Sequence, residues 1–343
     1  MLTIEERISS FIRFGRKISL LLSTHDHALA DVMQQAFAAN AWFTIENQQY
    51  ALDRIASMLE EDAIRNWAAS YDIPQRNHPF KVGVVMAGNI PLVNFHDFLS
   101  VLITGHVFVG KLSTTDAILL PFMAKLLVED DNRWADFVLF TDAKLSNMDA
   151  VIATGSDNTS RYFEYYFSKY PHIIRRNRTS VGFLTGSETT ESIALIGNDV
   201  FRYFGLGCRN VSKIYVPDSY DITQLFEAFS CHQYIINHHK YHNNYDYQKA
   251  INLINKFPFY DSGWMLMKYS DDLFSPVSML YIESYNDTNE LISKILSVAD
   301  KIQCVVGEGQ LEGISVIRPG ESQSPSLTDY PDGVDVVQFL LNL

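Results

Sequence analysis

Residues 81–113 read KVGVVMAGNIPLVNFHDFLSVLITGHVFVGKLS and contain a helical connector, NFHDFLSVLI, between two short apolar runs rich in β-branched residues. The two runs are KVGVVMA and HVFVGKL. A helical stretch after Leu119 and two more runs of the same kind, DFVLF and AVIAT, follow. Strands that alternate with helices predict a parallel sheet covered on both faces, with a ligand at the carboxyl ends of the strands. The predicted fold class is α/β.

The sequence on either side of this stretch has a different pattern. Residues 1–78 carry helical apolar stripes and begin with Thr3 and Glu6 at the spacing of a capping box. Two prolines near residue 78 then break the helical pattern and mark a boundary. A second αβ portion begins near TSVGFL at Thr179 and contains the apolar runs ESIALIG, KIYVP, VSMLYIES and GISVIR. We expect the final run, VDVVQFLLNL, to be a strand or helix that docks on the core or on a second subunit.

Composition limits the class of protein. A length of 343 residues is enough for two compact domains. The net charge of -13 argues against nucleic acid as a main partner, and we expect the one basic run, Arg175, Arg176 and Arg178, to form a solvated loop face. No apolar run approaches about 18 residues, so no membrane span is expected. Acidic residues at the amino terminus argue against a secretory signal, and three cysteines without CxxC spacing fit a reducing compartment, so we expect a cytoplasmic protein.

Three positions combine a reactive or polar side chain with a turn or a strand end. Two glycines closely precede Cys208, where they would let the backbone approach a ligand, and Arg209 would favour the thiolate. Asn89 lies in a Gly-Asn-Ile-Pro turn after a strand, where its amide would reach a developing oxyanion. Lys111 ends the next strand and would reach a ribose hydroxyl or a phosphate. Each also has an ordinary explanation, as a packing cysteine, a turn asparagine and an exposed strand terminus. The GxGxxG dinucleotide fingerprint does not occur in the sequence.

The order of these elements resembles the aldehyde dehydrogenase superfamily. In that superfamily an Asn-x-Pro turn, a strand-end lysine, a Thr-Gly-Ser loop, a nucleophilic cysteine and a Glu-x-Phe-Gly-Pro-Val segment follow one another. The corresponding elements here are Asn89-Ile90-Pro91, Lys111, Thr154-Gly155-Ser156, Cys208 and Asp272-Leu273-Phe274-Ser275-Pro276-Val277. The phrase AGNIPLVNFHDFLSVLITGH further resembles the bacterial acyl-CoA and acyl-protein thioester reductases, whose best-known members supply luminescent bacteria with aldehyde. The match covers about residues 80 to 290.

The resemblance implies roles in catalysis. Cys208 would be the nucleophile, and Asn89 with the Cys208 backbone amide would form the oxyanion hole. Aldehyde-oxidising members often carry a glutamate that activates water, and Thr185 stands at the corresponding position here. Glu188 and Glu191 lie close by and would be the substitutes. Loss of the hydrolytic base suits a reductase, because hydrolysis would waste the thioester.

The resemblance also implies a nicotinamide cofactor. Lys111 would hold the adenosine ribose or its phosphate. Gly155 and Ser156 would lie under the cofactor phosphates at the start of a helix that runs from about residue 159, which suits an anion. Asp272 would bond the nicotinamide ribose, and Phe274 would pack beside it.

Thr114 is a second departure from the superfamily pattern, because NAD-selective enzymes often carry a glutamate there. Without a carboxylate near the ribose, a 2′-phosphate is repelled less, so NADPH is favoured over NADH. The implied architecture is a Rossmann-type cofactor domain plus an αβ catalytic domain after a helical amino-terminal region. The expected division is a helical region, a nicotinamide-cofactor-binding domain, a catalytic thiol domain and a carboxyl-terminal segment, at residues 1–78, 79–180, 181–318 and 319–343.

The expected function is NADPH-dependent reduction of an acyl thioester of coenzyme A or acyl-carrier protein to an aldehyde, through an acyl-enzyme on Cys208. One alternative is an aldehyde dehydrogenase that runs towards the acid, and another is a non-catalytic, partner-binding subunit. His238, His239 and His242 include an i, i+4 pair without an HExxH glutamate, so we expect a surface or subunit contact there and no metal. The length is short for the superfamily, so a partner protein is expected to complete the substrate site or the assembly. A homodimer is the alternative to a partner enzyme.

Overall fold

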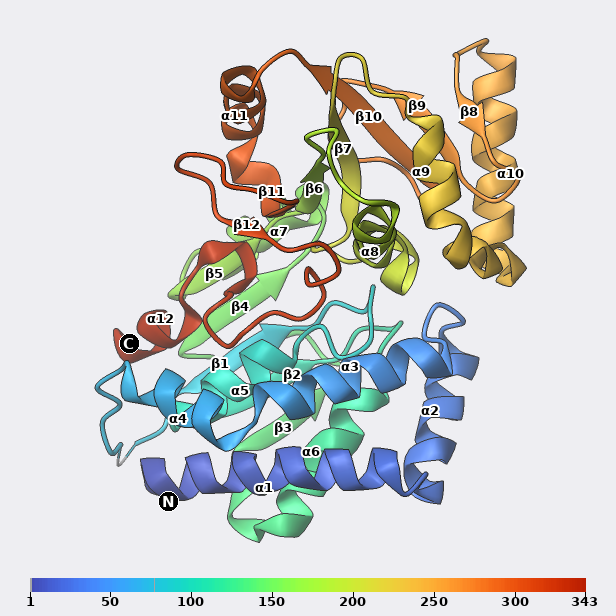
Figure 1. Cartoon of the computed structure of the whole chain (residues 1–343). Coiled ribbons are helices and arrows are strands. Elements are labelled where there is room, and N and C mark those ends of the chain that lie inside the picture. Colours follow the sequence, from blue (N-terminus) through green and yellow to red (C-terminus); the bar gives the residue numbers. More distant parts are fainter. Residues whose placement is uncertain (1, 77) are drawn as a thin grey trace. The chain divides into compact units, whose positions relative to one another are not determined.

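The computed structural model describes residues 2–76 and 78–343 (Figure 1). The chain divides into two compact units, residues 1–177 with 325–343, and residues 178–324. Each unit contains a largely parallel sheet, and helices precede the first strand, so the predicted α/β fold class with its helical amino-terminal region is confirmed. Within the described residues, we find no helix with the length and apolar character that a membrane crossing requires.

The amino-terminal region of the first unit is helical. Its helices are α1 Ile4–Ser23, α2 His27–Ala39, α3 Ile45–Met58 and α4 Glu61–Ala69. The predicted capping box is confirmed, because the Thr3 amide donates to the Glu6 carboxylate at 2.7 Å and the Glu6 amide donates to the Thr3 hydroxyl at 3.3 Å. α1 packs against α3 and α4 and buries Phe11 and Phe14 completely or nearly so. The apolar stripe of the sequence is therefore the inner face of α1.

A five-stranded parallel sheet forms the centre of the first unit. Its strands are β1 Lys81–Val85, β2 Val107–Lys111, β3 Val138–Thr141, β4 Ala150–Thr154 and β5 His172–Arg175, in the spatial order β3-β2-β1-β4-β5. The helices between them are α5 Phe95–Ile103, α6 Leu119–Asp130 and α7 Asp157–Phe167, and the 3-10 helix η1 spans Asn132–Trp134. Because neighbouring strands are parallel, the loops after β1, β2 and β4 leave from the same edge of the sheet.

The prediction of a solvated loop face is wrong for Arg175. This residue ends β5 and is only 5% exposed, and its guanidinium donates two hydrogen bonds, of 2.6 and 2.7 Å, to the Asp97 carboxylate on α5. The bidentate geometry offsets the cost of removing both charges from water. Arg176 is exposed and pairs with Glu164 at 2.7 Å, and Arg178 is half-buried. Consecutive basic residues therefore have different environments, because Arg175 lies in a strand that the sequence pattern did not predict.

The second unit contains a seven-stranded sheet in the order β12-β11-β6-β7-β10-β9-β8, in which only β8 runs antiparallel to its neighbour. The strands are β6 Thr179–Phe183, β7 Val211–Pro217, β8 Tyr260–Asp261, β9 Leu266–Tyr269, β10 Met279–Tyr285, β11 Ile302–Val306 and β12 Val316–Ile317. The helices are α8 Thr190–Phe201, α9 Thr223–Ala228, α10 His239–Ile254 and α11 Thr288–Ser297, with 3-10 helices η2 Arg202–Gly205, η3 Phe229–Asn237 and η4 Ala299–Lys301. TSVGFL, KIYVP, VSMLYIES and GISVIR each contain a strand, whereas ESIALIG lies in helix α8.

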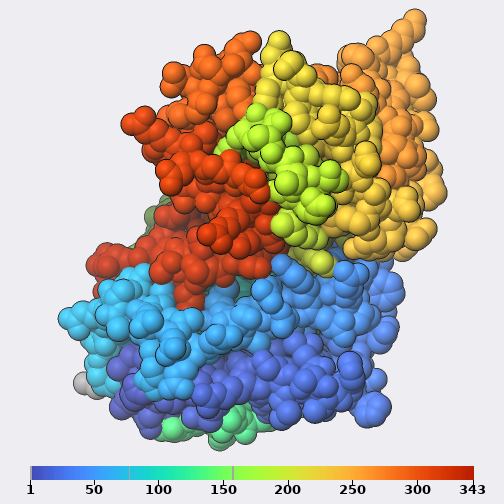
Figure 2. Space-filling view, viewed as in Figure 1, coloured from blue at the N-terminus to red at the C-terminus, as the bar shows by residue number. Residues whose placement is uncertain are grey.

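Residues 325–343 return to the first unit. They form η5 Pro331–Gly333 and α12 Val336–Leu341, and α12 packs against α5. The Trp67 indole donates to the Tyr330 hydroxyl at 2.8 Å, and the Tyr71 hydroxyl donates to the Asp335 carboxylate at 2.8 Å. Figure 2 shows the carboxyl-terminal residues, in red, against the light-blue surface near residue 70. The final apolar run is thus a helix that docks on the core of its own unit.

Two buried histidines hold the same carboxyl-terminal segment. His96 Nε2 lies 3.0 Å from the Leu327 carbonyl, and His106 Nε2 lies 3.2 Å from the Leu340 carbonyl. His106 Nδ1 accepts a hydrogen bond of 3.2 Å from the Phe80 amide, so the ring is the neutral tautomer with its proton on Nε2. Burial, with the nearby charge of Arg76, lowers the pKa of His106 to about 4.

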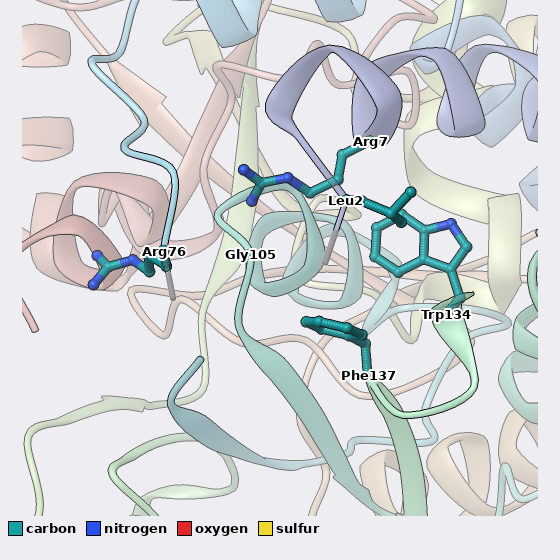
Figure 3. A pocket seen from close by; sticks show the side chains of 6 residues that line it. All are labelled: Leu2, Arg7, Arg76, Gly105, Trp134 and Phe137. Atoms are coloured by element: carbon teal, nitrogen blue, oxygen red, sulfur yellow. The ribbon is translucent and has the colours of Figure 1, made fainter. Parts of the chain in front are cut away.

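Arg7 lies buried beside the loop of Gly105 (Figure 3). Its Nη1 donates to the Ile103 carbonyl at 2.8 Å, and burial together with Arg76 lowers its pKa to about 10. Gly105 has a φ of +81°, and a Cβ at this position would come within 2.3 Å of Arg7 Nη1, so only glycine fits. A cavity of about 10 Å³ reaches from here to Trp134, which leaves room for one water at most.

Candidate active site residues

Cys208 lies on a tight turn between η2 and β7. The preceding residues 203–205, Tyr-Phe-Gly, all have left-handed backbone, with φ of 54°, 59° and 77°. This conformation is costly for two aromatic residues, and such strain is typical of functional sites. The turn itself is closed by a hydrogen bond of 3.0 Å from the Asn210 amide to the Gly207 carbonyl. Cys208 is a partly exposed residue of this turn.

The side chain of Asn210 fixes this turn. Its Oδ1 accepts from the Gly207 amide at 2.8 Å, and its Nδ2 donates to the carbonyls of Asp199 and Arg202 at 3.0 and 2.8 Å. Asn210 is 2% exposed, so these bonds are made away from water. We expected no role for Asn210, although an asparagine two residues after Cys208 in a glycine-rich turn is a recognisable turn signal.

Two further contacts hold the backbone around Cys208. The Ser180 hydroxyl on β6 donates to the Cys208 carbonyl at 3.0 Å. Arg209, which we expected to favour the thiolate, donates through Nε to the Ser322 carbonyl. Its guanidinium is therefore anchored to the carboxyl-terminal end of the second unit, and its effect on the thiolate stays a prediction.

The Asp272–Phe274 segment lies in the loop between β9 and β10. The Asp272 carboxylate is exposed, and Phe274 is 38% exposed. The Asp272 amide donates to the Ser270 hydroxyl at 3.2 Å. Both side chains are thus accessible to a ligand, as their expected role with a cofactor requires.

A short hydrogen-bonded path joins the Cys208 turn to the Asp272 loop. The Thr179 hydroxyl on β6 lies 3.2 Å from the Asn210 carbonyl and 2.8 Å from the Ser212 hydroxyl on β7. Ser212 in turn donates to the Leu273 carbonyl at 2.7 Å. The two predicted elements of the second unit therefore belong to one hydrogen-bonded framework.

The two glutamates considered as general bases lie near the start of α8. The Glu188 carboxylate accepts from the Thr185 amide and hydroxyl at 2.6 and 2.9 Å, and from the Gly186 amide at 3.0 Å. Hydrogen bonds from the Glu191 backbone amide and from the Thr189 side chain lower the pKa of the Glu191 carboxyl. Glu188 is thus occupied in closing the Thr185 turn, and Glu191 is held in the charged form at the surface.

In the first unit, Asn89 is exposed in the turn that follows β1. The buried side chain of Asn94 accepts from the Ala87 amide at 3.1 Å and donates to the Ala87 carbonyl at 2.8 Å. Leu92 has a φ of 57°. The ends of the turn that carries Asn89 are therefore fixed.

A second anchor of this turn comes from the amino-terminal helices. Asn40, directly after α2, places its Nδ2 3.3 Å from the Thr115 carbonyl and 3.5 Å from the Gly88 carbonyl. The Thr115 hydroxyl also donates to the Gly88 carbonyl at 3.0 Å. The helical region, which carries no chemistry by its sequence, thus supports the turn that presents Asn89.

Lys111 ends β2, and its Nζ donates to the Asp142 carbonyl at 3.3 Å. Thr114 is exposed three residues later. Asp116 follows and is 3% exposed. Burial raises the pKa of Asp116 to about 6, although nearby backbone amides, among them that of Leu92, oppose the shift.

Gly155 and Ser156 lie between β4 and α7. The Gly155 amide donates to the Arg175 carbonyl at 3.2 Å, and a Cβ on Gly155 would come within 3.0 Å of Phe163 and Thr159. Ser156 is the N-cap of α7 and accepts from the Thr159 amide. The helix begins at 157, two residues earlier than expected, so both residues stand at its positive end, which suits an anion.

The sheet brings four predicted residues to one edge. β2 and β4 flank β1, with Val85 opposite Lys111 on one side and Ala153 on the other. Asn89 and the Gly155–Ser156 loop follow the ends of β1 and β4, and Lys111 is the last residue of β2. Cys208, Asp272 and Phe274 belong to the second unit, and the convergence of the two sets stays a prediction.

The histidine run lies at the start of α10. The His238 ring is tilted against that of Phe204 and stacked on that of His239, with centroid distances of 4.4 and 5.1 Å. His242 Nε2 lies 3.5 Å from the Asp246 carboxylate. Across residues 2–76 and 78–343, no group of three or more His, Cys, Asp or Glu side chains is placed to hold a metal ion.

Comparisons with known proteins place the fold. No family model and no curated protein matches the sequence. Among solved structures, the chain is similar to an indole-3-acetaldehyde dehydrogenase of P. syringae in complex with NAD+ (TM-score 0.67, 13% identity, 93% of this chain and 77% of that chain). It is also similar to an aldehyde dehydrogenase of Bacillus cereus in complex with NAD+ (TM-score 0.64, 14% identity, 90% of this chain and 72% of that chain). A third similar structure is lactaldehyde dehydrogenase of Escherichia coli (TM-score 0.64, 12% identity, 90% of this chain and 75% of that chain). The chain therefore has the fold of the aldehyde dehydrogenases.

Proposed function

We propose that this chain reduces an acyl thioester of coenzyme A or acyl-carrier protein to an aldehyde, with NADPH, through an acyl-enzyme on Cys208. The observation that carries the proposal is the setting of Cys208, partly exposed on a turn that strained backbone and the Asn210 amide hold rigid. A nucleophile needs access and a fixed position at once.

The residues at the edge of the first sheet fit a nicotinamide dinucleotide. Gly155 and Ser156 lie directly before the amino terminus of α7. Because Gly155 has no side chain, a pyrophosphate would be able to approach the backbone there closely. Lys111 and the neutral, exposed Thr114 would take the adenosine ribose and its 2′-phosphate, so NADPH is preferred, with NADH as the alternative. Asp272 and Phe274 would bind the nicotinamide ribose. When bound, the cofactor would supply the hydride.

The proposed chemistry of Cys208 has two stages. Its thiolate attacks the thioester carbonyl, a carbon–sulfur bond forms, and the carrier thiolate leaves and takes a proton. After hydride addition to the acyl carbon, the oxyanion collapses, the bond to Cys208 breaks, and the aldehyde leaves with the thiolate restored. In both stages the Asn89 amide and the Cys208 backbone amide would donate to the oxyanion.

The direction of the reaction follows from the missing hydrolytic base. Thr185 cannot activate water as a carboxylate does, and Glu188 accepts three hydrogen bonds from the turn at 185–186. Exposed Glu191 keeps the alternative open, which is an aldehyde dehydrogenase that runs towards the acid. Chromatography of the products separates the two, since acid in place of aldehyde would support the alternative.

Acylation is the direct test. Purified protein incubated with radioactive acyl-CoA in the absence of cofactor should become labelled, and Cys208→Ala should not. Cys231→Ala is the matched control, because Cys231 is exposed but lies outside the proposed site, and it should label normally. Labelling retained by Cys208→Ala would overturn the proposal. A wild-type protein that neither labels nor turns over alone would favour a non-catalytic, partner-binding subunit.

We further propose a cytoplasmic location and assembly as a homodimer or with a partner enzyme. Fractionation of cells and size-exclusion chromatography with light scattering would test the two statements separately.

A further inference from the structure

The second unit contains a buried lysine that the proposed chemistry does not use. Lys213 on β7 is 1% exposed, and its Nζ lies 2.5 Å from the carboxylate of Glu283 on the neighbouring strand β10. Removing an ammonium from water costs several kcal/mol, and a carboxylate at this distance offsets much of that cost. An apolar side chain would fill the same space without a charge to compensate. What lysine adds at this position is a hydrogen-bond donor.

That donor is directed to the backbone of the Asp272 loop. Lys213 Nζ donates to the Asp271 carbonyl at 3.0 Å, and the adjacent Ser212 donates to the Leu273 carbonyl at 2.7 Å. Residues 270–278 contain neither helix nor strand, so no regular hydrogen-bond ladder fixes them. Two consecutive residues of a central strand thus hold the carbonyls on both sides of Asp272, whose carboxylate is exposed.

We infer that Lys213 is a positioning residue, whose ammonium fixes the Asp271 carbonyl and so orients the Asp272 carboxylate for a ribose of the cofactor. The inference rests on the proposed function. A hydrogen bond from a charged donor is roughly twice as strong as a neutral one, which suits an anchor for a loop that binds a ligand. Glu283 positions the ammonium in turn.

Lys294 on α11 provides a matched control. Its Nζ lies 3.0 Å from the other oxygen of the Glu283 carboxylate, so it belongs to the same ion-pair network. Lys294 donates to the Ser284 carbonyl and pairs with Glu290, and among the described residues neither these bonds nor its ion pair with Glu283 involves the Asp272 loop. A change at Lys294 therefore disturbs the network without releasing the Asp271 carbonyl.

The experiment compares Lys213→Met, Lys294→Met and wild type in NADPH binding, measured by the fluorescence of the bound cofactor, with melting temperature and acyl-CoA labelling of Cys208 as parallel readouts. We expect Lys213→Met to raise the Kd for NADPH about tenfold or more, as loss of a charge-assisted positioning contact predicts. Lys294→Met should lower the melting temperature but keep the Kd within about twofold. Labelling should persist in both, because acylation needs no cofactor.

Two results would overturn the inference. One is a folded Lys213→Met protein whose Kd for NADPH equals that of wild type, and the other is an equal rise in Kd for both lysine variants, which would indicate a general structural effect. If Lys213→Met does not fold, Ser212→Ala replaces it, since it removes the neutral bond to the Leu273 carbonyl together with the contact to the Thr179 hydroxyl and leaves Lys213 in place. A rise of about threefold in Kd is then expected, and an unchanged Kd refutes the loop-anchoring role of β7. Failure of the wild type to bind NADPH or NADH would instead refute the proposed function.

Discussion

Replacement of His106 by glutamine should remove a pH-dependent part of the stability of the first unit. His106 is fully buried, its Nδ1 accepts from the Phe80 amide and its Nε2 donates to the Leu340 carbonyl. A second proton would have to enter at Nδ1, where the Phe80 N–H already points. Glutamine keeps an amide donor that can reach the Leu340 carbonyl but has no group that titrates.

The magnitude follows from the pKa values. Burial, Arg76 and, to a smaller extent, Arg7 lower the pKa of His106 from 6.5 to about 4, while Asp149 and the Leu340 carbonyl oppose the shift. The unfolded chain then binds more protons between pH 6.5 and 4, so the stability that neutral His106 provides is complete above pH 6.5 and is lost as the pH falls towards 4. The full loss is about 3 kcal/mol, of which about 2 kcal/mol falls between pH 7 and pH 5.

Urea titrations at pH 7, 6 and 5 measure this effect. Tryptophan fluorescence is a suitable signal, because Trp42, Trp67 and Trp134 all lie in the first unit. His106→Gln should lose about 2 kcal/mol less than wild type between pH 7 and pH 5. His27→Gln changes an exposed histidine of the same unit and should behave as wild type. Equal pH dependence of wild type and His106→Gln would refute the reasoning.

Three other changes test other parts of the molecule. Arg175→Met leaves the buried Asp97 carboxylate without its partner and should lower the free energy of unfolding by about 3–5 kcal/mol in urea; a loss below about 1 kcal/mol would mean that the pair contributes little. Gly88→Ala places a Cβ within 2.2 Å of the Thr115 hydroxyl, so thioester reduction should fall about 100-fold while the protein stays folded by circular dichroism; unchanged turnover would separate this turn from catalysis. Thr114→Glu should lower kcat/KM for NADPH relative to NADH about tenfold, and an unaltered ratio would place the 2′-phosphate elsewhere.

Local sequence patterns predicted most of the strands of the first sheet and the residues at its carboxyl edge. β1, β2 and β4 are runs of β-branched residues buried on both faces, and such runs contrast with the helices between them. The parallel arrangement then carries Asn89 and Lys111 to one edge without further information. β5 was not recognised because its four residues include His172 and Arg175, and only a partner 78 positions away explains a buried arginine.

The residues that support the candidate site were harder to predict. Asn40 reaches the Gly88 turn across 48 positions, and Lys213 reaches the Asp271 carbonyl across 58. Such contacts depend on how elements pack, and no periodicity or spacing within a short window encodes them. Cys208 and Asn89 were identified by motif order, which says nothing of the anchors around them.

The return of residues 325–343 to the first unit makes the second unit an insertion in the chain. The polypeptide leaves the first unit after 177 and re-enters it at 325, so the interior of the first unit is incomplete until Val336, Val337 and Leu340 arrive, all three of which are fully buried there. On the ribosome, all of residues 178–324 emerge before those side chains do. The order of synthesis therefore favours completion of the inserted unit before the first unit can close over α12.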